Sequence, residues 1–312
     1  MTTIGVTAPG GPEALHLVDV PPEPMQPGHV RVRVTAAAIN PGDTLARSRP
    51  RPDDRPPGEV DVLGMDLAGT ITEIGPDVRT DLTVGDAVIG IAQPQGTHGS
   101  YRDDIVLPIA SVTRAPKGAT DIAASTLLQN GLTALQALDV LGLESGQVLA
   151  VTGAAGAVGG YAVQLGKHAG LTVIADASEA DEQLVRELGA DIVVRRGPEV
   201  AERFRGHFPD GVDGLVDAAL LNQAALPAVR DGGTMASVRG YHGDGERGVV
   251  VTPVRIPLYA QRADKIAQLR DLQEAGVVAL RVGAVFPATE AAEAHRRLEG
   301  GGVRGRIVLR FD

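Results

Sequence analysis

Two kinds of apolar periodicity divide the chain. Residues 1 to about 118 contain short stretches in which apolar and polar side chains alternate, such as 30–34 and 70–74, separated by Pro and Gly. Such alternation is typical of half-buried β-strands. Between 121 and 141, Ala and Leu recur at helical spacing. A segment rich in Pro, Arg and Asp, 49–59, is expected to form an exposed loop.

The middle of the chain alternates between strands and helices. Apolar runs at 148–152, 171–177, 214–217 and 234–237 lie between helical segments that include 182–188 and 259–275. This order predicts parallel βαβ units with right-handed crossovers, as in a doubly wound Rossmann domain. Strand texture returns at 277–286 and 306–309, around a helix at 291–298. We predict an α/β protein with a β-rich domain of residues 1–119, completed by 278–312, and a Rossmann domain of residues 120–277.

A glycine-rich turn lies between the strand at 148–152 and the helix that follows it. Its glycines are Gly153, Gly156 and Gly159. In a βαβ unit the first permits a tight turn, the second lets a pyrophosphate approach, and the third lets the helix pack closely. The amides of Ala157 and Val158 would then face the anion at the positive end of the helix dipole. The turn predicts dinucleotide binding, and the alternative is a plain structural turn.

Composition narrows the function. The absence of Cys excludes disulfides, thiolate zinc sites and a cysteine nucleophile. The formal net charge of −10 disfavours nucleic acid as a partner. There is no apolar run of about 18 residues and no basic segment followed by an apolar one at the start, so we expect no membrane partner and a cytoplasmic location.

Short motifs along nearly the whole chain occur in the order found in one family. They are Asn40-Pro-Gly-Asp43 with Arg47, Gly64-Met65-Asp66-Leu-Ala-Gly69, Val84-Gly-Asp86, Gly131-Leu-Thr133-Ala134, Gly153 to Gly159, Leu188-Gly-Ala-Asp191 and Gly305-Arg306-Ile-Val-Leu309. In these motifs the chain resembles zinc-free quinone oxidoreductases of the medium-chain dehydrogenase/reductase superfamily. The resemblance implies a GroES-like catalytic domain, a Rossmann domain, and hydride transfer from a nicotinamide in the cleft between them.

Zinc-dependent relatives place a catalytic His after the glycine that corresponds to Gly64, and a Cys ahead of it. This chain has Met65 at that position and no Cys. No Lewis acid would then lower the pKa of an alcohol, so we expect no metal and no alcohol dehydrogenation of that type. Quinones and enones remain suitable, because they accept hydride at an electron-poor carbon and delocalise the negative charge onto a carbonyl.

The resemblance also places side chains near the nicotinamide. Asn40 and Thr133 would position the ring or the substrate carbonyl, with a turn for Asn40 and a helix cap for Thr133 as the structural alternatives. Leu45 stands where many relatives have Tyr, and Arg239 where a small residue normally borders the nicotinamide. Arg239 would recognise an acidic substrate or point outward. His295 lies among charged residues, which indicates a surface position.

The residues that follow the second Rossmann strand bear on the choice of nicotinamide. Ser178 matches a residue that receives the 2′-phosphate of NADP, but Glu182 replaces the usual Lys four positions later. Asp176 is placed one or two positions early for a carboxylate that binds ribose in NAD enzymes. Arg196, after the third strand, would bind phosphate, or would simply be a solvated surface residue. We predict NADPH, with NADH left open.

The predicted function is NADPH-dependent reduction of a quinone or α,β-unsaturated carbonyl, without metal. One alternative is an enoyl reductase of polyketide-like metabolism, which the same fold serves. Another is a dinucleotide-binding redox sensor without turnover, suggested by Leu45 and Arg239. Relatives commonly pair their Rossmann sheets, so a homodimer is expected.

Overall fold

The strands of the computed structural model form three sheets within its described residues, 2–50, 56 and 58–312. Most of the loop expected at 49–59 lies outside these residues. The strands are β1 (Ile4–Val6), β2 (His16–Leu17), β3 (His29–Ile39), β4 (Asp61–Val62), β5 (Asp66–Ile74), β6 (Ala87–Ile91), β7 (Asp104–Pro108), β8 (Val112–Arg114), β9 (Val148–Thr152), β10 (Thr172–Ala177), β11 (Ile192–Arg195), β12 (Val212–Asp217), β13 (Val229–Ser237), β14 (Val250–Pro253), β15 (Val282–Pro287) and β16 (Arg306–Arg310). The α-helices are α1 (Pro41–Ser48), α2 (Asp121–Ala124), α3 (Leu128–Leu141), α4 (Ala157–His168), α5 (Glu182–Glu187), α6 (Val200–His207), α7 (Ala263–Glu274) and α8 (Ala291–Glu299).

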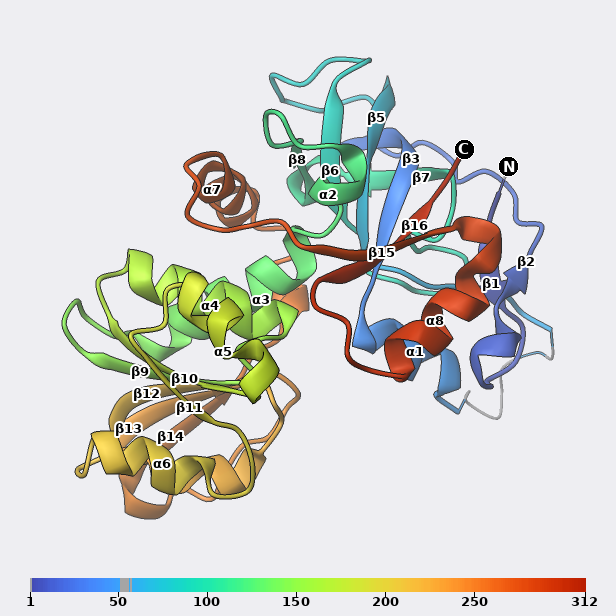
Figure 1. Cartoon of the computed structure of the whole chain (residues 1–312). Coiled ribbons are helices and arrows are strands. Elements are labelled where there is room, and N and C mark those ends of the chain that lie inside the picture. Colours follow the sequence, from blue (N-terminus) through green and yellow to red (C-terminus); the bar gives the residue numbers. More distant parts are fainter. Residues whose placement is uncertain (1, 51–55, 57) are drawn as a thin grey trace. The chain divides into compact units, whose positions relative to one another are not determined.

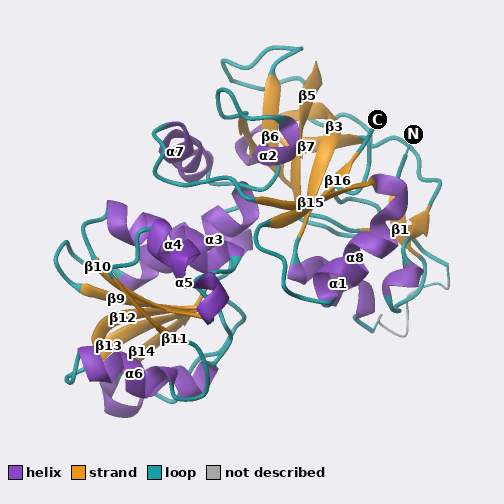
Figure 2. Cartoon of the chain, viewed as in Figure 1, coloured by secondary structure: helices purple, strands orange, loops and turns teal. Residues whose placement is uncertain are grey.

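One sheet consists of six parallel strands in the order β11-β10-β9-β12-β13-β14. The order reverses between β9 and β12, which is the switch point where open α/β sheets bind ligands at the carboxyl ends of their strands. Helices α4 and α6 lie on opposite faces of this sheet, as Figures 1 and 2 show, which is the arrangement of a doubly wound sheet. The predicted doubly wound Rossmann domain is confirmed.

The other two sheets form the β-rich part of the chain. The larger has the order β15-β16-β3-β5-β6-β8, with β7 also paired to β3, and the smaller has the order β2-β1-β4. Strand β16 pairs antiparallel with β3, so this late segment of the chain joins the sheet formed by early residues. The core between these strands includes Val32, Ile71 and Leu107, all at most 1% exposed.

Contacts between Cα atoms group the chain into two compact units. The first comprises Met1–Gln129, Ala260–Glu274 and Leu280–Asp312, and the second comprises Asn130–Tyr259 and Ala275–Ala279. Helix α7, which the sequence pattern assigned to the Rossmann domain, groups with the first unit because it packs against β8. The predicted domain boundaries, 1–119 with 278–312 and 120–277, stay a prediction.

The helical pattern at 121–141 corresponds to two helices rather than one. Helix α2 ends at Ala124 and α3 begins at Leu128. At the break, the Ser125 hydroxyl donates to the Ile122 carbonyl at 2.9 Å, and the Thr126 hydroxyl donates to the Ala123 carbonyl at 2.7 Å. Ser and Thr compete for backbone carbonyls in this way and so interrupt or bend helices. The apolar spacing alone did not reveal the interruption.

No described helix is both long enough and apolar enough to span a bilayer. The cytoplasmic location stays a prediction.

His295 in α8 is fully buried, so the predicted surface position was wrong. Its Nδ1 lies 3.0 Å from Nη1 of Arg47, and its Nε2 lies 3.1 Å from the hydroxyl of Tyr101. Because a guanidinium only donates, Nδ1 is the acceptor and the proton resides on Nε2. The Tyr101 hydroxyl then donates to Oδ2 of Asp43 at 3.2 Å. The charged neighbours of His295 in the sequence gave no sign of these partners from distant segments.

Burial governs the protonation of this chain of groups. Burial, with the nearby guanidinium of Arg47, lowers the pKa of His295 to about 3. Burial raises the pKa of Asp43 to about 6. The imidazole is therefore neutral in the folded protein at pH 7, whereas in the unfolded chain it titrates near its ordinary pKa.

The buried histidine predicts a pH-dependent stability difference between the wild type and His295→Gln. The folded pKa lies below the unfolded one, so the stability contributed by the neutral imidazole is lost as the pH falls below about 6.5. The advantage of the wild type in unfolding free energy should therefore shrink by about 2 kcal/mol between about pH 7.5 and pH 5. Denaturant unfolding followed by circular dichroism measures this difference.

The matched control is His207→Gln, because His207 is exposed in α6. Its difference from the wild type should stay constant over the same pH range. A constant difference for His295→Gln would show that the buried imidazole does not titrate as the structure implies.

Candidate functional site

The glycine-rich turn joins β9 to α4 through close backbone contacts. Gly153 has a φ of +66°, in the left-handed region that favours glycine. A Cβ on Gly159 would lie only 2.3 Å from the carbonyl oxygen of Gly153. The third glycine therefore lets the first turn of α4 rest directly on the backbone of the turn.

The first amides of α4 lie at the carboxyl end of β9. The helix begins at Ala157, with Gly156 as its N-cap residue. The first four amides of a helix have no carbonyl one turn earlier, and those of Ala157 and Val158 belong to this set. A Cβ on Gly156 would lie 3.0 Å from the Gly153 carbonyl oxygen, so a side chain there would crowd the turn. This backbone fits the diphosphate of a dinucleotide.

Asp176 supports the turn from the end of β10. Its carboxylate is 5% exposed, and Oδ1 accepts from the amides of Gly153 at 2.6 Å and Ala154 at 3.3 Å. Burial raises the pKa of this carboxyl even though the two amides favour its charged form. Asp176 precedes the usual position of a ribose-binding carboxylate by one or two residues. In this structure its Oδ1 is instead used to hold the backbone of the turn.

A second carboxylate, which the sequence pattern did not single out, holds the loop after β12. Asp217 accepts from the Thr152 hydroxyl at 2.6 Å and from the amides of Leu221 and Asn222 at 3.1 and 2.7 Å. In this loop Leu220 and Asn222 have φ values of +61° and +53°, which are unusual for residues with a side chain. A Cβ on Gly153 would lie 3.0 Å from the backbone of Ala218 in the same loop. Because neither Leu220 nor Asn222 is a glycine, the sequence contained no sign that the chain turns sharply here, and so Asp217 was not identified as the residue that holds this loop.

Ser178 and Arg196 lie side by side at the carboxyl ends of β10 and β11, where the Arg196 amide donates to the Ala177 carbonyl at 2.8 Å. The Ser178 hydroxyl donates to Oδ2 of Asp181 at 2.5 Å. The exposed guanidinium of Arg196 makes no hydrogen bond or ion pair in the part of the chain that the structure describes. The neighbouring Arg195 pairs with Glu179 at 3.2 Å. The structure thus brings together the two residues predicted for the 2′ position, while their role as ligands stays a prediction.

Asn40 is fully buried and its side chain is held inside the first unit. Its Nδ2 donates to Oδ2 of Asp66 at 3.0 Å and to the Ala38 carbonyl at 3.4 Å. Its Oδ1 accepts from Nη2 of Arg306 at 2.6 Å. Asn40 also precedes α1 as its N-cap residue, and its amide donates to Oδ2 of Asp43 at 2.7 Å. These contacts match the structural alternative, and a role toward the nicotinamide stays a prediction.

The remaining candidates differ in exposure. Thr133 is 6% exposed and lies within α3, well after its first residue, so it does not cap that helix. Arg239 is exposed and lies just beyond the end of β13. Leu45 is 52% exposed on α1. Their proposed positions beside a nicotinamide stay predictions.

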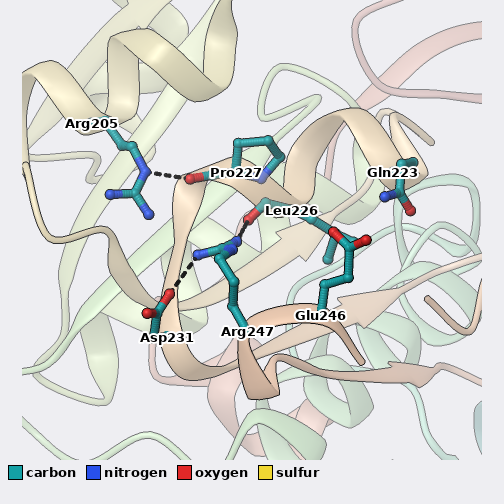
Figure 3. Close-up of a pocket in the computed structure, with 7 residues that line it drawn as sticks. All are labelled: Arg205, Gln223, Leu226, Pro227, Asp231, Glu246 and Arg247. Atoms are coloured by element: carbon teal, nitrogen blue, oxygen red, sulfur yellow. Dashed lines mark hydrogen bonds and ion pairs between the residues drawn. The ribbon is translucent and has the colours of Figure 1, made fainter. Parts of the chain in front are cut away.

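A separate pocket of about 300 Å³ lies in the second unit (Figure 3). Its Arg247 donates to the Leu226 and Val229 carbonyls at 2.7 and 2.8 Å, and to Asp231 at 3.0 Å. Arg205 donates to the Pro227 carbonyl at 2.5 Å. The residues that precede β13 and β14 form most of this pocket, so it lies at the amino edge of the parallel sheet. Its arginines bind backbone carbonyls, and we assign the pocket no part in binding the dinucleotide.

The contact between Gly159 and Gly153 generates a prediction. Gly159→Ala should lower the free energy of unfolding by about 1–3 kcal/mol, because a methyl group cannot fit against backbone atoms. It should also weaken dinucleotide binding, because the start of α4 must move. Denaturant unfolding and titration with NADPH measure the two effects.

The matched control is Gly206→Ala in α6, where a Cβ would meet nothing within 4 Å. This substitution should raise stability by about 0.5–1 kcal/mol and leave binding unchanged. Equal behaviour of the two variants would contradict the packing role of Gly159.

Two families match the chain. One is described as the alcohol dehydrogenase GroES-like domain and matches residues 26–117. The other is described as zinc-binding dehydrogenase and matches residues 188–309. Among the described residues, no group of three His, Asp or Glu side chains is arranged to hold a metal ion.

Relatives are similar in sequence over two thirds of the chain or more. A 2-haloacrylate reductase from Burkholderia is 29% identical over 96% of each chain. A probable zinc-binding oxidoreductase from Arthroderma benhamiae is 30% identical over 81% of this chain and 80% of the relative. Polyketide synthases from Streptomyces also match. For example, the spectinabilin system protein NorB of Streptomyces orinoci is 35% identical over 67% of this chain, which spans only 9% of the length of that relative.

Solved structures share the fold over the full length of both chains. A mycobacterial quinone oxidoreductase superposes with a TM-score of 0.83 at 26% identity. A mycobacterial protein complexed with NADPH superposes with a TM-score of 0.87 at 27% identity. Together with the glycine-rich turn at the carboxyl edge of a doubly wound sheet, these similarities show that the chain belongs to the medium-chain dehydrogenase/reductase superfamily, in its quinone oxidoreductase-like branch.

Proposed function

We propose that the protein is an NAD(P)H-dependent oxidoreductase that reduces a quinone or an α,β-unsaturated carbonyl. The observation that carries this proposal is the turn from Gly153 to Gly159, whose backbone packing leaves the first amides of α4 suited to a diphosphate. A bound nicotinamide would supply the hydride. The residues of the chain bind and orient it, with Gly153, Gly156, Ala157, Val158 and Gly159 at the diphosphate.

The names of the relatives support this substrate class. One relative is a 2-haloacrylate reductase, and one structural neighbour is a quinone oxidoreductase. Both names denote acceptors in which a carbon–carbon double bond is conjugated to a carbonyl or carboxyl group. We propose that the reaction needs no metal, because the chain has no Cys and carries Met65 where zinc-dependent relatives carry His.

NADPH is the proposed nicotinamide. The exposed guanidinium of Arg196 lies beside Ser178, where the 2′-phosphate of a dinucleotide on this turn would be received. A structural neighbour has been solved in complex with NADPH, which supports the assignment. Asn40 and Thr133 are proposed to lie toward the nicotinamide end, and Arg239 toward the substrate.

A second candidate function is enoyl reduction in polyketide-like metabolism. The observation that favours it is the 35% identity to a polyketide synthase over 67% of this chain. The chain spans 4 to 9% of the length of the first polyketide synthases that it matches. The substrates would then be enoyl thioesters, which are also α,β-unsaturated carbonyl compounds.

The proposed activity predicts consumption of NADPH. Absorbance at about 340 nm should fall when the protein and NADPH are mixed with a panel of quinones, enones and enoyl thioesters, and EDTA should leave the rate unchanged. Arg196→Ala should raise the KM for NADPH about tenfold and leave the KM for NADH within about twofold, because only the phosphate contact is lost.

The control is Arg195→Ala, which removes an exposed arginine that is already paired with Glu179. It should affect NADPH much less than Arg196→Ala does. Tight binding of NADPH without any oxidation would instead favour the redox sensor, and inhibition by EDTA would contradict a metal-free reaction.

We also propose that the protein forms a homodimer through β14. This strand ends the six-stranded order, and Val250 on it is 57% exposed. Edge strands of this kind readily pair with a second copy.

Light scattering should give about twice the 32.2 kDa of the chain, and Val250→Lys should give a monomer. Leu17→Lys, on an exposed residue of β2, should remain dimeric, and a monomeric wild type would contradict this proposal.

A further inference from the structure

The hydroxyl proton of Ser178 is already committed within the protein. It is donated to Oδ2 of Asp181 over 2.5 Å. Asp181 is 5% exposed, and its carboxylate does not cap α5, which begins at the next residue. The backbone reinforces the pair, because the Asp181 amide donates to the Ser178 carbonyl at 3.0 Å. A buried carboxylate thus fixes which way the serine donates.

The two nicotinamide nucleotides make different demands on such a serine. A 2′-phosphate dianion has only acceptor oxygens, so it requires the Ser178 proton. A 2′-hydroxyl can itself donate, so it binds the Ser178 oxygen while Asp181 keeps that proton. The negative charge of a buried carboxylate also repels a phosphate dianion more strongly than it would in water. Both effects disfavour NADPH relative to NADH.

Arg196 has the opposite effect. It lies beside Ser178 through the backbone bond to Ala177, and its exposed guanidinium suits a phosphate. The charges of Arg196 and Asp181 therefore have opposite effects on a 2′-phosphate. We propose that Asp181 is a specificity-determining residue that disfavours NADPH and preserves the use of NADH. This inference rests on the proposed function.

The test replaces Asp181 with Asn, which has nearly the same shape and no charge. The side-chain amide can donate to the Ser178 oxygen and so release the hydroxyl proton toward a phosphate. Asp181→Asn should tighten NADPH binding about tenfold and change NADH binding by less than about twofold. Fluorescence titrations of the full chain with NADPH and with NADH give both dissociation constants.

Glu187→Gln is the matched control, because it removes an exposed carboxylate at the far end of α5 that accepts from the side-chain amide of Gln183 at 2.8 Å. The ratio of the two dissociation constants should stay within about twofold of the wild-type ratio in this variant. Adding Asp181→Asn to Ser178→Ala should give a smaller gain for NADPH than Asp181→Asn gives alone, because only the relief of charge repulsion remains when the serine proton is absent. An equal effect of both carboxylate variants, or a gain that is undiminished without the serine, would overturn the role of Asp181.

Ser178→Ala alone is a second test of the role of Asp181, and its result does not depend on whether Asp181→Asn folds. Because the proton is committed to Asp181, removal of the hydroxyl should weaken NADH more than NADPH. A loss confined to NADPH would overturn the inference. Tight binding of both nucleotides with an unchanged ratio in Asp181→Asn would refute only this inference, whereas absence of binding in the wild type would refute the proposed function as well.

Discussion

The second unit depends on one backbone contact, the approach of Gly159 to the carbonyl of Gly153. A residue with a Cβ at position 159 would force this backbone to shift, because that atom would lie 2.3 Å from the oxygen. Two buried carboxylates hold the surrounding backbone in place: Asp176 binds the amides of the turn, and Asp217 binds the loop after β12. The ends of β9, β10 and β12 are therefore held together, and the first amides of α4 are fixed in place in the chain without a ligand.

In the first unit the corresponding constraint is a polar interior. Asn40, Asp43 and Arg47 come from one motif, Asp66 from a second, and Arg306 from a third. The structure joins them through hydrogen bonds, together with Tyr101 and His295. Buried charged groups are tolerated only where their partners are present, so each of these residues depends on the others. Gly64 belongs to the same arrangement, because a Cβ there would lie 2.2 Å from the Tyr101 ring.

Periodicity and glycine spacing predicted the Rossmann sheet, the turn and the β-rich domain, because each of these patterns involves residues that are close together in the sequence. The interruption at Ser125 and Thr126 escaped prediction, since the apolar spacing continues across it. The burial of His295 escaped for a different reason: its partners Arg47 and Tyr101 are distant in sequence. Sequence patterns identified Ser178 as a ligand candidate, but the direction in which its hydroxyl donates is decided by the carboxylate of Asp181. A motif can identify a candidate ligand residue, but only the three-dimensional structure shows which neighbouring group accepts its proton.

The hydrogen bonds of Asn40 also bear on how a substrate carbonyl would be stabilised. Both of its amide hydrogens are directed at acceptors within the first unit, Asp66 and the carbonyl of Ala38. A contact from this amide to a substrate would break a buried hydrogen bond, which costs about 1–3 kcal/mol when the abandoned acceptor finds no replacement. Asn40 therefore serves mainly to hold α1 and Arg306 in place.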